Sequence, residues 1–145
     1  MKATQESTWQ RSETMDQEIS KNFQETVDKF TIRHKSILDI ISKADEASAK
    51  VNRATIKAVT QCGCIEIEAR KHQWPKDVDI LDLKNMLNSD LAGQLCSDCR
   101  DIVESEIGKL LFYITALCNT LDLSFDEILV KENEKILTLG KFNFR

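Results

Sequence analysis

The sequence predicts an all-α protein, a helical bundle of four principal helices, and three observations favour this class. Breakers of regular structure are rare, because the 145 residues include one proline and four glycines. A β-sandwich or barrel would need many more tight turns than these residues can supply. Apolar residues recur at steps of three and four along most of the chain, as they do on one face of a helix. Hydrophobic residues make up 41% and charged residues 30%, which is typical of a folded globular domain.

The first helix is expected to begin near Thr14, after a flexible arm at residues 1–12 that is polar and lacks periodicity. Residues 13–145 are then expected to form one helical domain. The apolar stripe of the first helix comprises Met15, Ile19, Phe23, Val27, Phe30, Ile37 and Ile41. We expect a break at Ala44–Ser48, because a helix continuing to residue 72 would be roughly 90 Å long. The alternative is one continuous helix that a partner chain stabilises.

Three further helices are predicted after this break. The second is expected to end before Trp74, with Val51, Ala54, Ala58, Cys62, Ile65 and Ala69 on one face. A connector follows, with a short helical piece at residues 80–87 that Asp79 caps, and Gly93 closes that region. The third helix is expected from Ser97 to Leu121.

The last helix is expected to begin at Ser124. Glu127 follows three residues later and completes the pattern of a capping box. Gly140 is expected to end this helix.

Charge and hydropathy exclude several classes of function. The net charge is −4, which gives no reason to expect DNA or an anionic membrane as a partner. The apolar runs are too short to span a bilayer, and the first residues lack the apolar segment of a signal peptide. We therefore expect a cytoplasmic protein, in which five cysteines serve as thiols or metal ligands rather than as a disulfide framework.

Residues 103–142 read VESEIGKLLFYITALCNTLDLSFDEILVKENEKILTLGKF. This segment resembles the third and fourth helices of the MazG-like, all-α nucleoside triphosphate pyrophosphohydrolases, and Ala54–Arg70 would correspond to their second helix. The resemblance implies a homodimer that hydrolyses a nucleoside triphosphate with Mg²⁺. In that family, a Glu-x-x-Glu pair and a Glu-x-x-Asp pair on two helices hold the magnesium against the triphosphate.

This chain departs from the family's metal-binding pattern at both ends. Glu106 occupies the glutamate position of the second pair, but Lys109 stands where the family has an acid. On the second helix, Glu66 has no acid three residues before or after it. In the enzymatic interpretation, Glu66 and Glu106 are catalytic magnesium ligands, and Glu104 or Asp101 supplies another oxygen.

Lysines are expected to contact the phosphates in the enzymatic interpretation, and the candidates are Lys109, Lys131 and Lys135. The alternative for Glu106 is an interior acid that forms a salt bridge, with Lys109 as one candidate partner. The other acids would then be solvated surface charges.

Four of the cysteines form a second constellation, in which Cys62 and Cys64 make a C-x-C pair and Cys96 and Cys99 a C-x-x-C pair. Four thiols suffice for a tetrahedral zinc ion. Within a regular helix, however, side chains two residues apart point away from each other, so either Gly63 would loosen the turn or only one of the two cysteines would reach the metal. Plain packed thiols are one alternative, and a Cys96–Cys99 pair that oxidises reversibly is another.

Two functions therefore follow from the sequence. One is a divergent MazG-like enzyme that uses magnesium. The other is a catalytically inactive helical module that binds a nucleotide or a protein and contains a structural zinc ion.

Overall fold

The computed structural model describes residues 6–71, 82 and 85–140, with side chains described from residue 18 onward. The described part of the chain is mostly helical, with four helices and one small two-stranded sheet, so the all-α class is confirmed. The elements in chain order are α1 (Glu6–Phe30), α2 (Ile37–Lys57), η1 (Ala58–Cys62), β1 (Ile65–Ile67), β2 (Leu91–Gly93), α4 (Ser97–Thr120) and α5 (Phe125–Leu139).

The first two helices do not divide where the sequence predicted. Helix α1 already begins at Glu6, ahead of Thr14, and it ends at Phe30. The predicted break at Ala44–Ser48 is wrong, because α2 runs through it without interruption. Ala47 is buried within that stretch, so its small side chain allows close helix packing. The break falls instead at residues 31–36.

The segment between α1 and α2 is tied to both helices by polar side chains. Thr31 Oγ1 donates to the carbonyl oxygen of Val27 at 2.6 Å, in the last turn of α1. His34 Nδ1 pairs with the Asp39 carboxylate in the first turn of α2. These local bonds stabilise the turn, although neither a glycine nor a proline occurs there.

The second helix ends earlier than predicted and gives way to a strand. Helix α2 passes into a π-helical turn, η1, which ends at Gly63 with φ +71°. Glycine adopts this left-handed conformation at little cost, so the chain can turn sharply away from the helix axis. Ile65 of β1 then pairs with Gly93 of β2, and the two strands run antiparallel. Gly93 therefore lies within a strand and does not close the connector as predicted.

The last two helices agree with the sequence prediction. Helix α4 begins at Ser97, and α5 follows a short loop. The hydroxyl of Ser124 accepts a hydrogen bond from the Glu127 amide at 3.2 Å, as a capping residue does. Gly140 ends α5 with φ +44°. Of the short helical piece predicted at residues 80–87, residues 82, 85 and 86 are helical and Leu87 is not, whereas residues 80, 81, 83 and 84, with Asp79 before them, lie outside the described residues.

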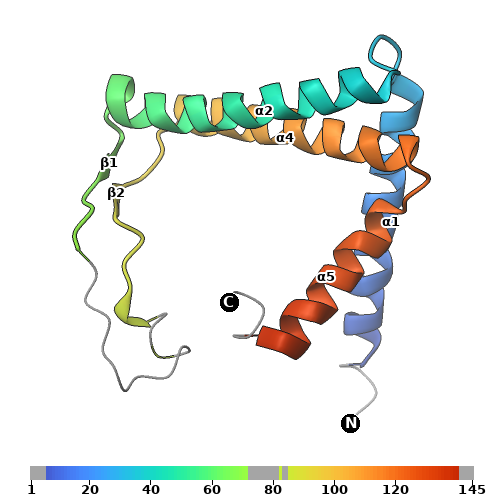
Figure 1. The fold of residues 1–145 in the computed structure, drawn as a ribbon. Coiled ribbons are helices and arrows are strands. Elements are labelled where there is room, and N and C mark those ends of the chain that lie inside the picture. The colour runs from blue at the N-terminus through green and yellow to red at the C-terminus, as the bar shows by residue number, and fades with distance from the viewer. Residues whose placement is uncertain (1–5, 72–81, 83–84, 141–145) are drawn as a thin grey trace.

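The helices form two pairs that meet at one end of the molecule (Figure 1). Helices α2 and α4 lie antiparallel along each other, whereas α1 and α5 lie side by side and cross the far end of that first pair. The β1–β2 ribbon extends from the opposite end of α2 and α4. The buried cluster of Val27, Ile40 and Ala116 lies where α1 meets α2 and α4. The core therefore lies far from the ribbon.

Candidate metal centre

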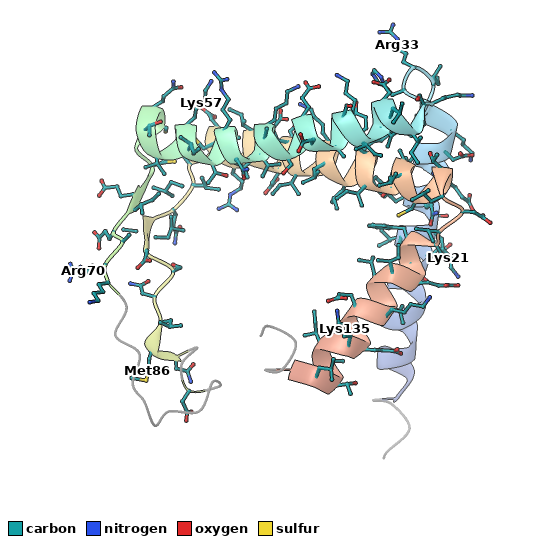
Figure 2. All side chains as sticks on the ribbon, viewed as in Figure 1. Lys21, Arg33, Lys57, Arg70, Met86 and Lys135 are labelled. Atoms are coloured by element: carbon teal, nitrogen blue, oxygen red, sulfur yellow. The ribbon has the colours of Figure 1, made fainter. Side chains whose placement is uncertain are left out.

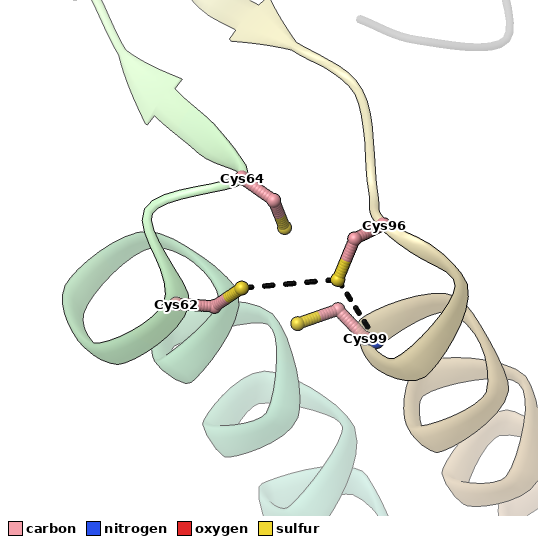
Figure 3. A group of neighbouring side chains, drawn as sticks. All are labelled: Cys62, Cys64, Cys96 and Cys99. Carbon is pink, nitrogen blue, oxygen red and sulfur yellow. Dashed lines mark hydrogen bonds between the residues drawn. The ribbon is translucent and has the colours of Figure 1, made fainter.

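The four clustered cysteines come from the ribbon end of the α2–α4 pair (Figure 3). Cys62 is the last residue of η1, and Cys64 follows the left-handed Gly63. Cys96 caps the N-terminus of α4, and Cys99 lies in the first turn of that helix. Because the chain leaves the helix at Gly63, the two cysteines of the C-x-C pair can face the same point. On a regular helix the Cys62 and Cys64 side chains would point away from each other, and the turn at Gly63 avoids this.

The sulfur atoms are spaced as metal ligands are. All four lie within 4.8 Å of one another, and the Cys62 and Cys96 sulfurs are 3.7 Å apart. Zinc bound tetrahedrally at about 2.3 Å from each thiolate would place the sulfurs about 3.8 Å apart. All five cysteines of the chain are free thiols. This cluster can therefore bind a metal ion such as zinc with small adjustments of side chains.

Hydrogen bonds within the cluster favour one thiolate over the others. The Cys99 amide donates to Cys96 Sγ at 3.5 Å, at the positive end of α4. This backbone bond, with help from the Cys99 thiol, lowers the pKa of Cys96 to about 7. A side-chain hydrogen bond to Cys96, and then burial, raise the pKa of Cys99, because the Cys99 thiol keeps the proton that it donates to the Cys96 sulfur. A divalent cation would remove this competition by stabilising all four thiolates together.

Gly93 is a positioning residue that the sequence analysis did not identify. It has φ +80°, and a Cβ atom at this position would lie 2.6 Å from the carbonyl oxygen of Cys64. Only glycine permits this approach of the two backbones, which brings the strand leading to Cys96 against the segment that contains Cys64. The sequence does not specify the left-handed conformation of Gly93. The one signal was that an isolated glycine stands close to the C-x-x-C pair, where it can mark a close approach of two backbones.

The acids proposed as magnesium ligands are not brought together. Glu66 is exposed on β1, opposite Ala92, whereas Glu106 lies in α4. Asp101 and Glu104 are exposed on α4 as well. Among the described residues, only the four cysteines form a group of three or more metal-ligating side chains within reach of one ion.

Glu106 is instead the half-buried partner of a lysine. Lys109 Nζ lies 2.6 Å from Glu106 Oε1, which is the salt bridge that the sequence offered as the alternative. The second carboxylate oxygen, Oε2, is buried and has no hydrogen-bond partner.

The acid of α2 that lies close to Lys109 is Glu46, which the sequence analysis missed. A hollow of about 100 Å³ between α2 and α4 is lined by Glu46, Lys43, Lys50, Lys109 and other residues. Glu46 accepts hydrogen bonds from Lys43 and Lys50, each at 2.7 Å. The helical spacing of 43, 46 and 50 was a signal for such a network, because it places the three side chains on one face.

The remaining predicted phosphate contacts lie on α5. Lys131 pairs with Glu127, and Lys135 pairs with Glu132, each at 3.4 Å. Figure 2 shows Lys135 on the α1–α5 side of the molecule, away from the ribbon that carries Glu66. The structure therefore distributes the predicted nucleotide-binding residues over three separate elements.

Comparisons with family models, curated proteins and solved structures gave no match to this chain. The MazG-like resemblance of residues 103–142 therefore stays a prediction. None of the described helices combines the length and apolar character needed to cross a membrane.

Proposed function

We propose that this protein is a zinc-stabilised helical module that assembles with a second copy of itself. The observation that carries the proposal is the convergence of four thiols from two segments separated by 31 residues of chain. Four cysteine ligands fill a tetrahedral zinc site and leave no open position for a substrate, so the zinc would be structural.

The position of the cysteines supports a structural role for the metal. The cluster of buried residues that includes Ile40 lies at the opposite end of the α2–α4 pair. Near the cysteines, the buried apolar side chains among the described residues are Ala58 and Ile65. Apolar burial at this end is therefore small, and a bound zinc ion would supply the missing stabilisation by joining η1 to the start of α4.

An apolar stripe that the rest of the described chain leaves exposed supports self-assembly. The stripe comprises Ile107, Leu111 and Ile114 of α4 and Leu121 directly after its end, all of which are exposed. These residues recur at helical spacing. Each of the first three directly follows a half-buried residue of α4, namely Glu106, Leu110 and Tyr113, so the stripe lies about 100° around the helix from that half-buried face. A continuous apolar face of this kind is typical of a helix that packs on two neighbours. A second copy of the chain would cover the stripe symmetrically.

Metal analysis of the purified protein tests the zinc proposal. We expect one zinc ion per chain, and removal of the metal by a chelator is expected to lower the thermal midpoint. Cys99→Ala is expected to lose the zinc, whereas Cys118→Ala is the matched control because Cys118 is a buried thiol of the same helix outside the cluster. Protein without bound zinc, or a Cys99→Ala variant that retains full zinc affinity, would contradict the proposal.

One observation favours magnesium-dependent pyrophosphohydrolysis as a second candidate function. The buried Glu106 Oε2 has no partner, and an unpaired buried carboxylate oxygen is costly unless a cation or a proton satisfies it. The test is release of pyrophosphate from nucleoside triphosphates with Mg²⁺. Glu106→Gln is expected to abolish this release, with the exposed Glu25→Gln as the control. Equal background rates in all three proteins would exclude this candidate.

A further inference from the structure

The four thiols of the cluster differ in their access to solvent. Cys62 is exposed, whereas Cys64, Cys96 and Cys99 are half-buried. Cys62 lies at the outer end of η1, where the chain turns away from the helix (Figure 3). A small oxidant that approaches from solvent therefore reaches the Cys62 sulfur first, and thiolate sulfur is the form that oxidants attack.

One neighbouring sulfur is placed to react with an oxidised Cys62. Cys96 Sγ is 3.7 Å from Cys62 Sγ, about the distance of two sulfur atoms in van der Waals contact. The sulfur atoms would have to approach by less than 2 Å to form a disulfide, which has an S–S length of about 2.0 Å. Cys62 and Cys96 belong to different segments, so this bond would join η1 to α4 as the metal does.

We propose that Cys62 is an oxidation site at which a hydroperoxide converts the zinc-bound cluster into a Cys62–Cys96 disulfide and releases the metal. This inference depends on the proposed zinc site. It goes beyond that site in two ways: it names a hydroperoxide as the co-reactant, and it selects the Cys62–Cys96 disulfide from the six that four cysteines allow.

The reaction balances as a two-electron oxidation. The Cys62 thiolate attacks one peroxide oxygen, the O–O bond breaks, and Cys62 becomes a sulfenic acid while the second oxygen leaves as hydroxide. The Cys96 thiolate then attacks the Cys62 sulfur, the S–S bond forms, and the sulfenic oxygen leaves as hydroxide. Two protons from solvent convert the two hydroxides into water. With an organic hydroperoxide the first leaving group is an alkoxide instead, which is protonated to an alcohol. Cys64 and Cys99 remain as two thiolates, too few to hold zinc tetrahedrally.

The test is to treat the zinc-loaded protein with one equivalent of hydrogen peroxide, measure released zinc with a coloured chelator, and block the remaining thiols. Trypsin cuts after Lys57, Arg70, Lys84 and Arg100, so residues 58–70 and 85–100 form separate peptides. We expect these two peptides to be joined by a disulfide without reduction. Cleavage before Asp98 then separates Cys96 from Cys99, and fragmentation within residues 58–70 distinguishes Cys62 from Cys64.

A Cys62→Ala variant gives the kinetic readout, with Cys118→Ala as the matched control. Zinc release is expected to be at least about ten times slower without the Cys62 thiol and unchanged in the control. The inference is overturned if the disulfide joins Cys96 to Cys99, if Cys64 replaces Cys62 in it, or if the zinc stays bound while peroxide is consumed. In those outcomes the zinc site itself stands, whereas protein that contains no zinc before treatment overturns both proposals.

Discussion

At the scale of single residues, the two glycines beside the cysteines have different roles. Gly63 and Gly93 both have a left-handed backbone conformation, with φ +71° and +80°. A Cβ atom at Gly63 would meet nothing within 4 Å, whereas at Gly93 it would overlap the Cys64 carbonyl oxygen. Gly63 is therefore required for its conformation alone, and Gly93 for its conformation and for the contact between backbones.

This difference predicts unequal effects of two alanine substitutions. Gly63→Ala is expected to lower the free energy of unfolding by about 1 kcal/mol, the cost of a left-handed alanine. Gly93→Ala is expected to cost at least about twice as much and to weaken zinc binding, because the Cys64 carbonyl has to move. Denaturant unfolding and a zinc titration of both variants check this. Equal losses in the two proteins would contradict the role assigned to Gly93.

Glu46 predicts a pH-dependent contribution to stability. Hydrogen bonds from Lys43 and then Lys50 lower the pKa of its carboxyl to about 2, from the usual 4.5. A lowered pKa in the folded state means that the stabilisation is complete above pH 4.5 and is lost as the pH falls toward 2. Glu46→Gln is therefore expected to lower the thermal midpoint only slightly at pH 7, because solvent screens exposed ion pairs, and by progressively less below pH 4.5. A difference that stays constant over this range would show that the ion pairs contribute nothing.

The sequence predicted the residues of the site better than it predicted their geometry. The two cysteine pairs and their spacing identified four thiols that the structure brings together, because candidate metal ligands are recognisable by type and separation. The role of Glu66 as a magnesium ligand was argued from a helix, and residue 66 lies in a strand. The conformation of one glycine, Gly63, determined this outcome, and glycine by itself does not specify whether a helix continues.

At the scale of the elements, α1 is joined to the α4–α5 loop by the side chain of one residue, Gln24. Its Nε2 donates to Asn119 Oδ1 and to the carbonyl oxygen of Leu123, each at 2.8 Å. Its Oε1 accepts from the amide of Phe125 at 2.8 Å, at the start of α5. The Asn119 amide donates in return to the Gln24 carbonyl oxygen at 3.2 Å. This network fixes where α5 begins relative to α1.

Removal of this side chain is expected to loosen α5 more than α4. Gln24→Ala leaves the half-buried Phe125 amide and the Asn119 Oδ1 atom without their Gln24 partner, at a cost of roughly 1–3 kcal/mol. The exposed neighbour Asn22→Ala is the control, with an expected change within about 0.5 kcal/mol. Hydrogen exchange is the measurement, and faster exchange in α5 than in α4 is the expected result. Uniform acceleration throughout the chain would indicate that the network has no local role.

The prediction of the elements succeeded where the ends of helices have side-chain signatures. Ser124 and Gly140 bounded α5 correctly, because a capping hydroxyl and a terminal glycine act through local bonds. The break between α1 and α2 has no such signature, because the local bonds of Thr31 and His34 do not follow a capping pattern and neither a glycine nor a proline occurs there. Packing against α4, which the sequence does not display, decides that Ala44–Ser48 remains helical.

At the scale of the whole molecule, the exposed apolar surface is large relative to the core. In the described part of the chain, the buried apolar residues are few and mostly small. Three exposed residues of the stripe, Ile107, Leu111 and Ile114, lie along about two turns in the middle of α4. A dimer would bury them as a continuous seam, and the energy of folding would then depend on protein concentration.

A charge in the centre of this stripe is expected to separate the two copies. Leu111→Glu loses apolar contact and places a carboxylate in the interface, at about 3 kcal/mol or more, which corresponds to at least about a hundredfold weaker association. Ile67→Glu is the control, because Ile67 is an exposed apolar residue of the ribbon. Sedimentation equilibrium of the three proteins is the measurement. A parent protein that is monomeric at micromolar concentration would contradict self-assembly.

The position of the cysteines also has a consequence for changes of chain length. Strand β1 leaves the helical pair directly after Cys64, and β2 leads back to it before Cys96, so the chain between the two cysteine pairs begins and ends at the same four thiols. When the four cysteines hold the two ends of this segment together, its length does not affect how α2 and α4 align. A longer segment then adds only a small entropic cost. Insertions or grafted hairpins between the two cysteine pairs should therefore be tolerated. A single residue added between Cys62 and Cys64 should not be tolerated.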